Sequence, residues 1–250
     1  PKNIIIYDQN GKQAMSLGGY RSYFGVGSDC MHIYDLDTGH RRKAVLEDVV
    51  KGIRLVDYLP NIDFIMSMFL PSDIPEDRYE RQQMSVMLQE STKPIVFVGL
   101  DANSTKYALE MASIAAGGLS NLRKYPFAIN YVNTVSAFHH NQESVQRLLY
   151  AAERNMPTVY APGNYRGMTG PMTIAGAMAL GNAGQLAGLV LSQLKREGSP
   201  FIRGNPSGFT MDMRSSRWRR SARRGGCPGP TPAATCSTRR RIVSPGNGMS

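Results

Sequence analysis

The stretch Pro94-Ile-Val-Phe-Val-Gly-Leu100 is apolar almost throughout, and a helical pattern follows it closely. A strand of a parallel sheet that is covered on both faces is hydrophobic along its whole length, without polar alternation. This stretch therefore predicts a buried parallel strand that leads into a helix.

The same strand-then-helix unit recurs along the chain. Its spacing of roughly 30 residues is typical of an α/β fold, either a doubly wound sheet or a (βα)8 barrel. Five strands are too few to close a barrel, so a (βα)8 barrel of the TIM type would be a partial one, and both architectures stay open from the spacing alone. The expected strands are Phe64–Phe69, Pro94–Leu100, Pro126–Val132, Thr158–Ala161 and Pro200–Arg203, and the expected helices are Glu76–Glu90, Thr105–Ala116, Gln142–Asn155 and Met172–Arg196.

Residues 1–45 have a different character, with short apolar runs such as Ile4–Tyr7 separated by glycine turns. They predict a short β-rich segment that precedes the barrel portion at 46–213. The pair Gly25-x-Gly27 lacks a third glycine and a following helix, so a tight loop is favoured over a dinucleotide-binding motif.

Residues 214–250 form an arginine-rich tail with nine arginines and no acidic residue. Removing those nine from the 29 basic residues leaves 20 against 19 acidic residues, so the body is nearly neutral. The pI near 9.7 therefore describes the tail and is weak evidence for nucleic-acid binding. Two origins stay open for the tail: a reading-frame shift in GC-rich DNA, or a genuine disordered basic segment.

Cysteine and histidine usage limits the chemistry that the body can perform. Cys30 is the one cysteine before the tail, which excludes a disulfide framework in the body and favours a reducing, cytoplasmic setting. Neighbouring side chains such as His139 and His140 seldom converge on one metal, so no bound metal is expected. The apolar stretch 174–194 has the length of a membrane span, but its glycines favour a closely packed helix and no membrane is expected.

Polar and aromatic residues near the ends of the expected strands are the candidate functional residues, because active sites of α/β folds lie at the carboxyl ends of the strands. Near Asp101, Asn103 or Ser104 could serve instead as the cap of the helix that follows. For the tyrosines the alternatives are a ring face that binds a cation and ordinary apolar packing. The candidates on strands are Asp101, Tyr131, Asn133 and Tyr160.

The loop 163–171 is the most unusual loop of the body, because three glycines precede a helix within it. Such a loop can bring backbone N–H groups close to an anion such as a carboxylate. It lacks the lysine of a nucleotide-binding loop. Its candidate binding residues are Gly163, Gly167 and Gly170.

Several segments together resemble the trimethylamine methyltransferase family, which includes pyrrolysine-containing enzymes and relatives without that residue that act on quaternary amines. The resemblance covers nearly the whole body and ends at Arg214. The segments are Phe24–Cys30, Tyr34–Arg41, Leu59–Phe64, Thr92–Phe97, Ala151–Pro157, Gly170–Gly176, Leu186–Leu191 and Met211–Arg214.

The resemblance implies a (βα)8 barrel that passes a methyl group from a methylated amine, such as trimethylamine or a betaine, to the Co(I) of a corrinoid. The corrinoid would be held by a separate partner protein and not by this chain. Within that resemblance, Tyr131 and Tyr160 could face the cation, Asp101 could add negative charge, and the loop 163–171 could hold a carboxylate. Family members are longer, so the chain resembles a fragment with an aberrant tail; a homo-oligomer is left open.

Two other classes of function stay open at this stage. A lyase or aldolase on the same fold would need a Schiff-base lysine near the carboxyl end of a strand, and Lys93 precedes its strand. A nucleic-acid-binding protein would act through the basic tail and lose affinity steeply with salt.

Overall fold

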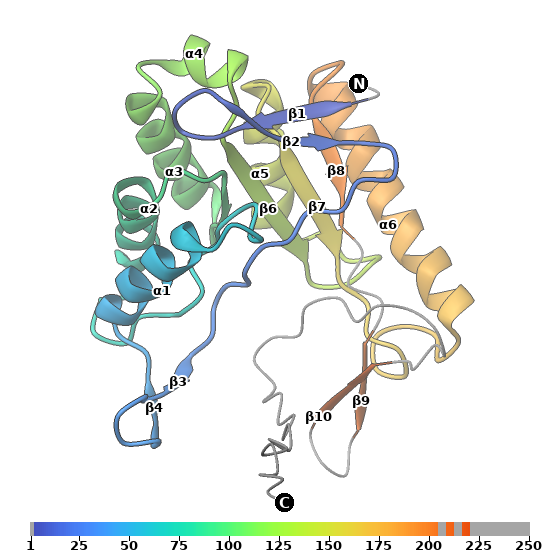
Figure 1. Cartoon of the computed structure of the whole chain (residues 1–250). Helices are drawn as coiled ribbons and strands as arrows, with labels where there is room; N and C mark the ends of the chain where they lie inside the picture. The colour runs from blue at the N-terminus through green and yellow to red at the C-terminus, as the bar shows by residue number, and fades with distance from the viewer. Residues whose placement is uncertain (1–2, 205–208, 213–216, 221–250) are drawn as a thin grey trace, which may run out of the picture.

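The centre of the molecule is a parallel four-stranded sheet (Figure 1). A computed structural model describes residues 3–204, 209–212 and 217–220. The predicted stretch around Pro94 contains the first strand of the sheet, and the predicted parallel α/β arrangement is confirmed. The strand order is β5-β6-β7-β8, with β5 at Ile95–Val98, β6 at Ala128–Thr134, β7 at Thr158–Pro162 and β8 at Phe201–Arg203.

The helices pack on one face of this sheet, which we call the helix face. Its buried strand residues Ile95, Phe97 and Ala128 share a core cluster with residues of α1, α2, α3 and α5. The four helices expected from the sequence are confirmed, with ends that differ by a few residues. The helices are α1 (Leu46–Tyr58), α2 (Tyr79–Glu90), α3 (Ala102–Ala115), α4 (Leu119–Lys124), α5 (Gln142–Glu153) and α6 (Ile174–Lys195).

The opposite face of the sheet, which we call the inner face, is covered by an N-terminal hairpin. Ile6 and Met15 of the hairpin pack against Val96 and Ile129 of the sheet. The Tyr7 N–H donates to the carbonyl oxygen of Pro126, which precedes β6 by two residues. The hairpin therefore lies near the amino ends of the strands. The antiparallel pairs are β1 (Ile4–Tyr7) with β2 (Gln13–Leu17), β3 (His32–Tyr34) with β4 (Arg41–Lys43), and β9 (Phe209–Asp212) with β10 (Arg217–Arg220).

The face on which the helices lie distinguishes a barrel wall from a doubly wound sheet. Among the described residues, the inner-face cluster contains no helix residue. A doubly wound sheet has helices on both faces, whereas a barrel wall has them outside only. Figure 1 shows an open sheet, so closure into a (βα)8 barrel stays a prediction.

Two further segments extend the sheet beyond β5 through single parallel bridges. Ile65 pairs with Ile95, and Gly25 pairs with Phe64. The predicted strand 64–69 is therefore present as isolated bridges, because Met68 has a φ of 61° and interrupts the extended backbone. The predicted tight loop at Gly25 is wrong: a Cβ there would lie 2.2 Å from the Phe64 ring, so glycine permits close approach of two sheet segments.

Helix α6 packs on the helix face through its glycines, as the sequence indicated. A Cβ on Gly188 would lie 2.3 Å from the ring of Tyr160, and a Cβ on Gly184 would lie 2.5 Å from the Ala137 carbonyl oxygen. Within the described residues α6 is the one helix with the length and composition of a membrane span, and 28% of its most apolar window is buried. Core helices of soluble proteins pass the same test, so the expectation of no membrane stays a prediction.

The start of α1 is fixed by a buried carboxylate. Asp48 is 6% exposed and accepts from Arg42 Nη1 and Nη2 at 2.7 and 2.8 Å and from the Val45 N–H at 2.9 Å. The hydrogen bonds from Arg42 lower the pKa of Asp48 most, followed in the same direction by the Val45 N–H.

We expect Asp48→Asn to lower the free energy of unfolding by about 1–2 kcal/mol at pH 7, since Arg42 is partly solvated. Because the pKa of Asp48 is lowered in the folded state, its contribution is present above the unfolded-state pKa and is lost as the pH falls through the folded-state pKa. Urea unfolding at pH 7 and near pH 3 measures the free energy of unfolding of wild type and variant. The difference between the two proteins should be smaller near pH 3 than at pH 7. An equal difference at both pH values would contradict the role of the charge. Glu47→Gln, which breaks an exposed ion pair, is the matched control.

Candidate functional site

The carboxyl ends of the parallel strands meet at one edge of the sheet, away from the β1–β2 hairpin (Figure 1). The register aligns Val98 of β5 with Tyr131 of β6 and with Val159 of β7. One step further toward this edge, Asn133 is aligned with Ala161 and is exposed. Tyr131 and Asn133 alternate with the buried helix-face residue Val132, so both lie on the inner face.

Asp29 lies at the same edge, at the end of the segment that pairs with residues 64–69. The Cys30 N–H next to it donates to the Met68 carbonyl oxygen at 3.0 Å. Asp29 has a φ of 62°, a left-handed conformation that Asn and Asp tolerate better than most residues. Its side chain is exposed to solvent, yet enough protein surrounds the carboxyl that burial raises its pKa; the Ser28 hydroxyl at 3.0 Å opposes this.

Three tyrosines lie within electrostatic range of one another or of Asp29. Burial raises the pKa of Tyr131, and the charges of Tyr165 and Asp29 add to the effect. Burial also raises the pKa of Tyr79 to about 12, with contributions from Glu80 and Asp29. We call Asp29, Tyr79, Tyr131 and Tyr165 the acidic tyrosine group.

The acidic tyrosine group has the chemistry of a cation site. A carboxylate supplies negative charge, and aromatic ring faces attract a quaternary ammonium at about 0.5–2 kcal/mol each. A cleft of about 420 Å³ opens beside Tyr79, with Met31, Leu70 and Leu100 among its lining residues. Tyr79 is the member of the group that lines this cleft, and Lys43 and Glu76 line it as well.

Asp101 lies on the helix side of the edge and caps α3. Its carboxylate accepts from the Ser104 N–H at 2.7 Å and from the Ser104 hydroxyl at 2.8 Å. These hydrogen bonds lower its pKa, the backbone one most. The sequence had suggested Asn103 or Ser104 as the cap, and the structure assigns it to Asp101 instead. A carboxylate committed to a cap is a weaker candidate for substrate binding.

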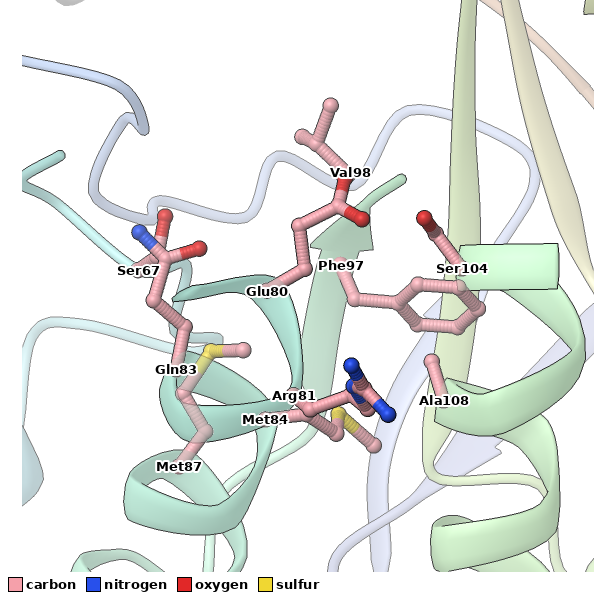
Figure 2. A pocket seen from close by; sticks show the side chains of 10 residues that line it. All are labelled: Ser67, Glu80, Arg81, Gln83, Met84, Met87, Phe97, Val98, Ser104 and Ala108. Carbon is pink, nitrogen blue, oxygen red and sulfur yellow. The ribbon is translucent and has the colours of Figure 1, made fainter. Parts of the chain in front are cut away.

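Glu80 of α2 lies close to the same cap. Figure 2 shows its carboxyl near Val98 and Ser104, beside a cavity of about 10 Å³, which is room for roughly one water. The Leu100 N–H donates to Glu80 Oε1. Burial raises the pKa of Glu80, while the Ser104 hydroxyl and the Leu100 N–H oppose the rise.

Tyr160 does not belong to the acidic tyrosine group. It is 0% exposed, lies on the helix face against Gly188, and contacts His140 through its hydroxyl group. This placement favours packing of the ring over a role in lining a pocket, although the hydroxyl is buried against His140 and does not lie at a rim. Substrate binding by Tyr160 stays a prediction.

Part of the backbone of the glycine loop 163–170 pairs within the loop. The N–H groups of Met168, Thr169 and Gly170 donate to the Tyr165 carbonyl oxygen, and the Gly167 N–H donates to the Gly170 carbonyl oxygen. These N–H groups are not available to an anion, and binding of a carboxylate by the rest of the loop stays a prediction. Gly167 has a φ of 78°, which explains glycine at that position. Gly163 has ample room, since a Cβ added there would meet no atom nearer than 3.7 Å.

The lysine considered for a lyase or aldolase does not lie at the carboxyl edge. Lys93 lies at the amino end of β5, and its Nζ donates to the Val56 and Leu59 carbonyl oxygens at 2.7 and 2.6 Å, so it is not placed for Schiff-base chemistry. In the part of the chain that the structure describes, no three His, Cys, Asp or Glu side chains lie close enough to hold a metal ion. The basic tail lies outside the described residues except for β10.

Asp29 is the candidate that the sequence did not reveal. The signal was the segment Phe24-Gly-Val-Gly-Ser28, which has the length of a short sheet segment and is followed directly by a carboxylate. Interpreting Gly25 and Gly27 as turn residues hid it. A glycine can also mark a strand that another backbone or ring approaches closely.

The described residues thus define an α/β protein with a parallel sheet and a cation-suited group at the carboxyl edge. Comparison with known families identifies it further: the trimethylamine methyltransferase (MTTB) family matches residues 1–230. The chain belongs to this family. The match passes Arg214, where the resemblance seen in individual sequence segments ended.

Individual relatives are methyltransferases by name. The chain is 28% identical over 216 residues to a glycine betaine methyltransferase of Desulfitobacterium hafniense (strain Y51), covering 86% of this chain and 45% of the relative. It is 27% identical to the trimethylamine methyltransferase MttB of Desulfitobacterium hafniense (strain DSM 10664 / DCB-2), covering 86% and 43%. It is 26% identical over 184 residues to a proline betaine:corrinoid methyltransferase of Eubacterium limosum, covering 70% and 37%. The chain spans less than half the length of these relatives.

Proposed function

We propose that this protein takes part in transfer of a methyl group from a methylated amine to the corrinoid of a partner protein. Membership of the methyltransferase family supports the reaction class. The observation in the structure that supports the substrate is the placement of Asp29 and the inner-face residue Tyr131 at the carboxyl edge, within electrostatic range of each other. A carboxylate and an aromatic ring are the groups that attract an ammonium.

The chain's own residues would bind and orient the substrate. A tertiary amine can leave a quaternary ammonium without being protonated, so the site needs no general acid; the corrinoid supplies the nucleophile, a Co(I) centre. Asp29 and Tyr131 would hold the cation, and the surrounding protein would keep water from it. Asn133, exposed one step further out on the inner face, would contact the part of the substrate nearest the edge.

The rim of the edge suits a protein partner that brings the corrinoid. Several large apolar side chains there are exposed, which is typical of a surface that another molecule covers. They follow β5, β6 and β7 and are Leu100, Val135, Phe138, Met168 and Met172.

We expect methyl transfer to a purified corrinoid protein in its Co(I) state from at least one of trimethylamine, glycine betaine and proline betaine. The measurement is the absorbance change on formation of methyl-cobalt, with the amine product determined in parallel. Because the chain is shorter than its relatives, the assay compares it with a version of family length. If neither transfers a methyl group from any methylated amine, the proposed function is wrong.

A further inference from the structure

Arg147 of α5 is a buried cation that the proposed chemistry does not use. It is 3% exposed and lies on the helix side of the sheet. Burial lowers its pKa to about 10, while Glu80 and Asp101 act in the opposite direction. Burying a charge costs free energy unless the charge is paired and hydrogen-bonded. The burial of an arginine at this position therefore suggests a specific role.

The guanidinium of Arg147 holds the backbone of the acidic tyrosine group. Its Nη2 donates to the carbonyl oxygen of Tyr131 in the middle of β6. A second hydrogen bond goes from the strand to the helix: Asn130 Nδ2 donates to the Arg147 carbonyl oxygen at 3.4 Å. Helix α5 is thus joined to β6 at Tyr131 and at the residue before it, whose side chain is fully buried.

Glu80 and Asp101 lie within electrostatic range of Arg147, and their negative charges oppose the lowering of its pKa. Both carboxylates are themselves fixed, Asp101 by the N-terminal turn of α3 and Glu80 by the Leu100 N–H. An unbalanced guanidinium behind the edge would repel a cation bound there. The two carboxylates allow a rigid cation to support the site without this repulsion.

We propose that Arg147 is a positioning residue that holds Tyr131, through its carbonyl oxygen, in the place where its ring binds the ammonium substrate. The inference rests on the proposed function for the identity of the substrate. Lysine keeps the charge but not the planar fork of donors, so it should replace Arg147 incompletely.

A first experiment separates positioning from general stability by steady-state methyl transfer. In Arg147→Met we expect KM for the ammonium substrate to rise about tenfold, as for loss of a hydrogen bond from a charged donor, with kcat changed less. Arg147→Lys should raise KM by a smaller factor. Val56→Ala, which removes buried methyl groups in α1 far from the edge, should lower the melting temperature and leave KM unchanged. A KM in the Arg147 variants equal to that of Val56→Ala overturns the proposal.

A second experiment does not depend on activity. Tyrosines are replaced by 3-fluorotyrosine, and the ¹⁹F resonance of Tyr131 is assigned by its loss in Tyr131→Phe. We expect this resonance to shift or broaden in Arg147→Lys and Arg147→Met and to stay in place in Val56→Ala. If the wild type transfers no methyl group, the proposed function fails while this measurement still decides the role of Arg147. An unmoved Tyr131 resonance in both Arg147 variants overturns it.

Discussion

Asp29→Asn should weaken binding of a quaternary ammonium by about 10- to 100-fold, or about 1.4–2.7 kcal/mol. The full Coulomb energy of a close pair is larger, but Asp29 is partly open to solvent, which reduces it. Asparagine has nearly the same shape and tolerates the φ of 62° at this position. The variant therefore changes the charge and leaves the backbone in place.

The measurement is the dissociation constant for tetramethylammonium and for glycine betaine by titration calorimetry. Asp37→Asn removes an exposed carboxylate from the β3–β4 turn and is the matched control. Because the pKa of Asp29 is raised, wild-type affinity should fall with decreasing pH sooner than for an ordinary aspartate. Asp29→Asn should remove that part of the pH dependence. Equal affinities in wild type and Asp29→Asn would show that the cation binds elsewhere.

The fold was largely predictable because its strands are apolar along their whole length. Stretches such as Ile95–Val98 can be buried only in the middle of a covered sheet, and the chain between them is long enough for a helix. The same property concealed which face each residue occupies. In Thr158–Pro162 no polar alternation marks one side, so the sequence could not show that Tyr160 points to the helices while Tyr131 points to the inner face.

The site was harder to predict because its parts depend on backbone conformation. Asp29 reaches the edge from a segment joined to the sheet by single bridges and bent at a left-handed residue. The glycines of the loop 163–170 suggested free N–H groups, yet the loop folds back so that the N–H groups of Gly167 and Gly170 donate to carbonyl oxygens within it. Arg147 lies beside Leu148 and four residues before Ala151, on the buried side of an amphipathic helix. A basic residue is ordinarily solvated, so its residue type argued against burial.

The packing of α6 gives the prediction with the largest effect on stability. Two effects of opposite sign act in Gly184→Ala. Alanine is favoured over glycine within a helix by about 1 kcal/mol. Its Cβ, however, would lie 2.5 Å from the Ala137 carbonyl oxygen, a backbone atom that cannot turn away as a side chain can, and 3.0 Å from Pro162. The added Cβ is fixed to the backbone of α6, and the oxygen that it meets belongs to the backbone at Ala137. We therefore expect the cost of the clash to exceed the gain in helix propensity.

We therefore expect Gly184→Ala to lower the free energy of unfolding by about 1–3 kcal/mol, the usual range for overpacking. Gly188→Ala should act in the same direction, because its Cβ would meet the fully buried Tyr160 ring at 2.3 Å. Replacing that ring relieves only one of the two clashes: Tyr160→Leu should partly rescue Gly188→Ala and should not rescue Gly184→Ala. Denaturant unfolding monitored by circular dichroism measures each difference, with Ala183→Ser on the exposed side of α6 as the control. Stabilisation by Gly184→Ala would mean that α6 does not pack this closely on the sheet, since helix propensity alone would then decide the outcome.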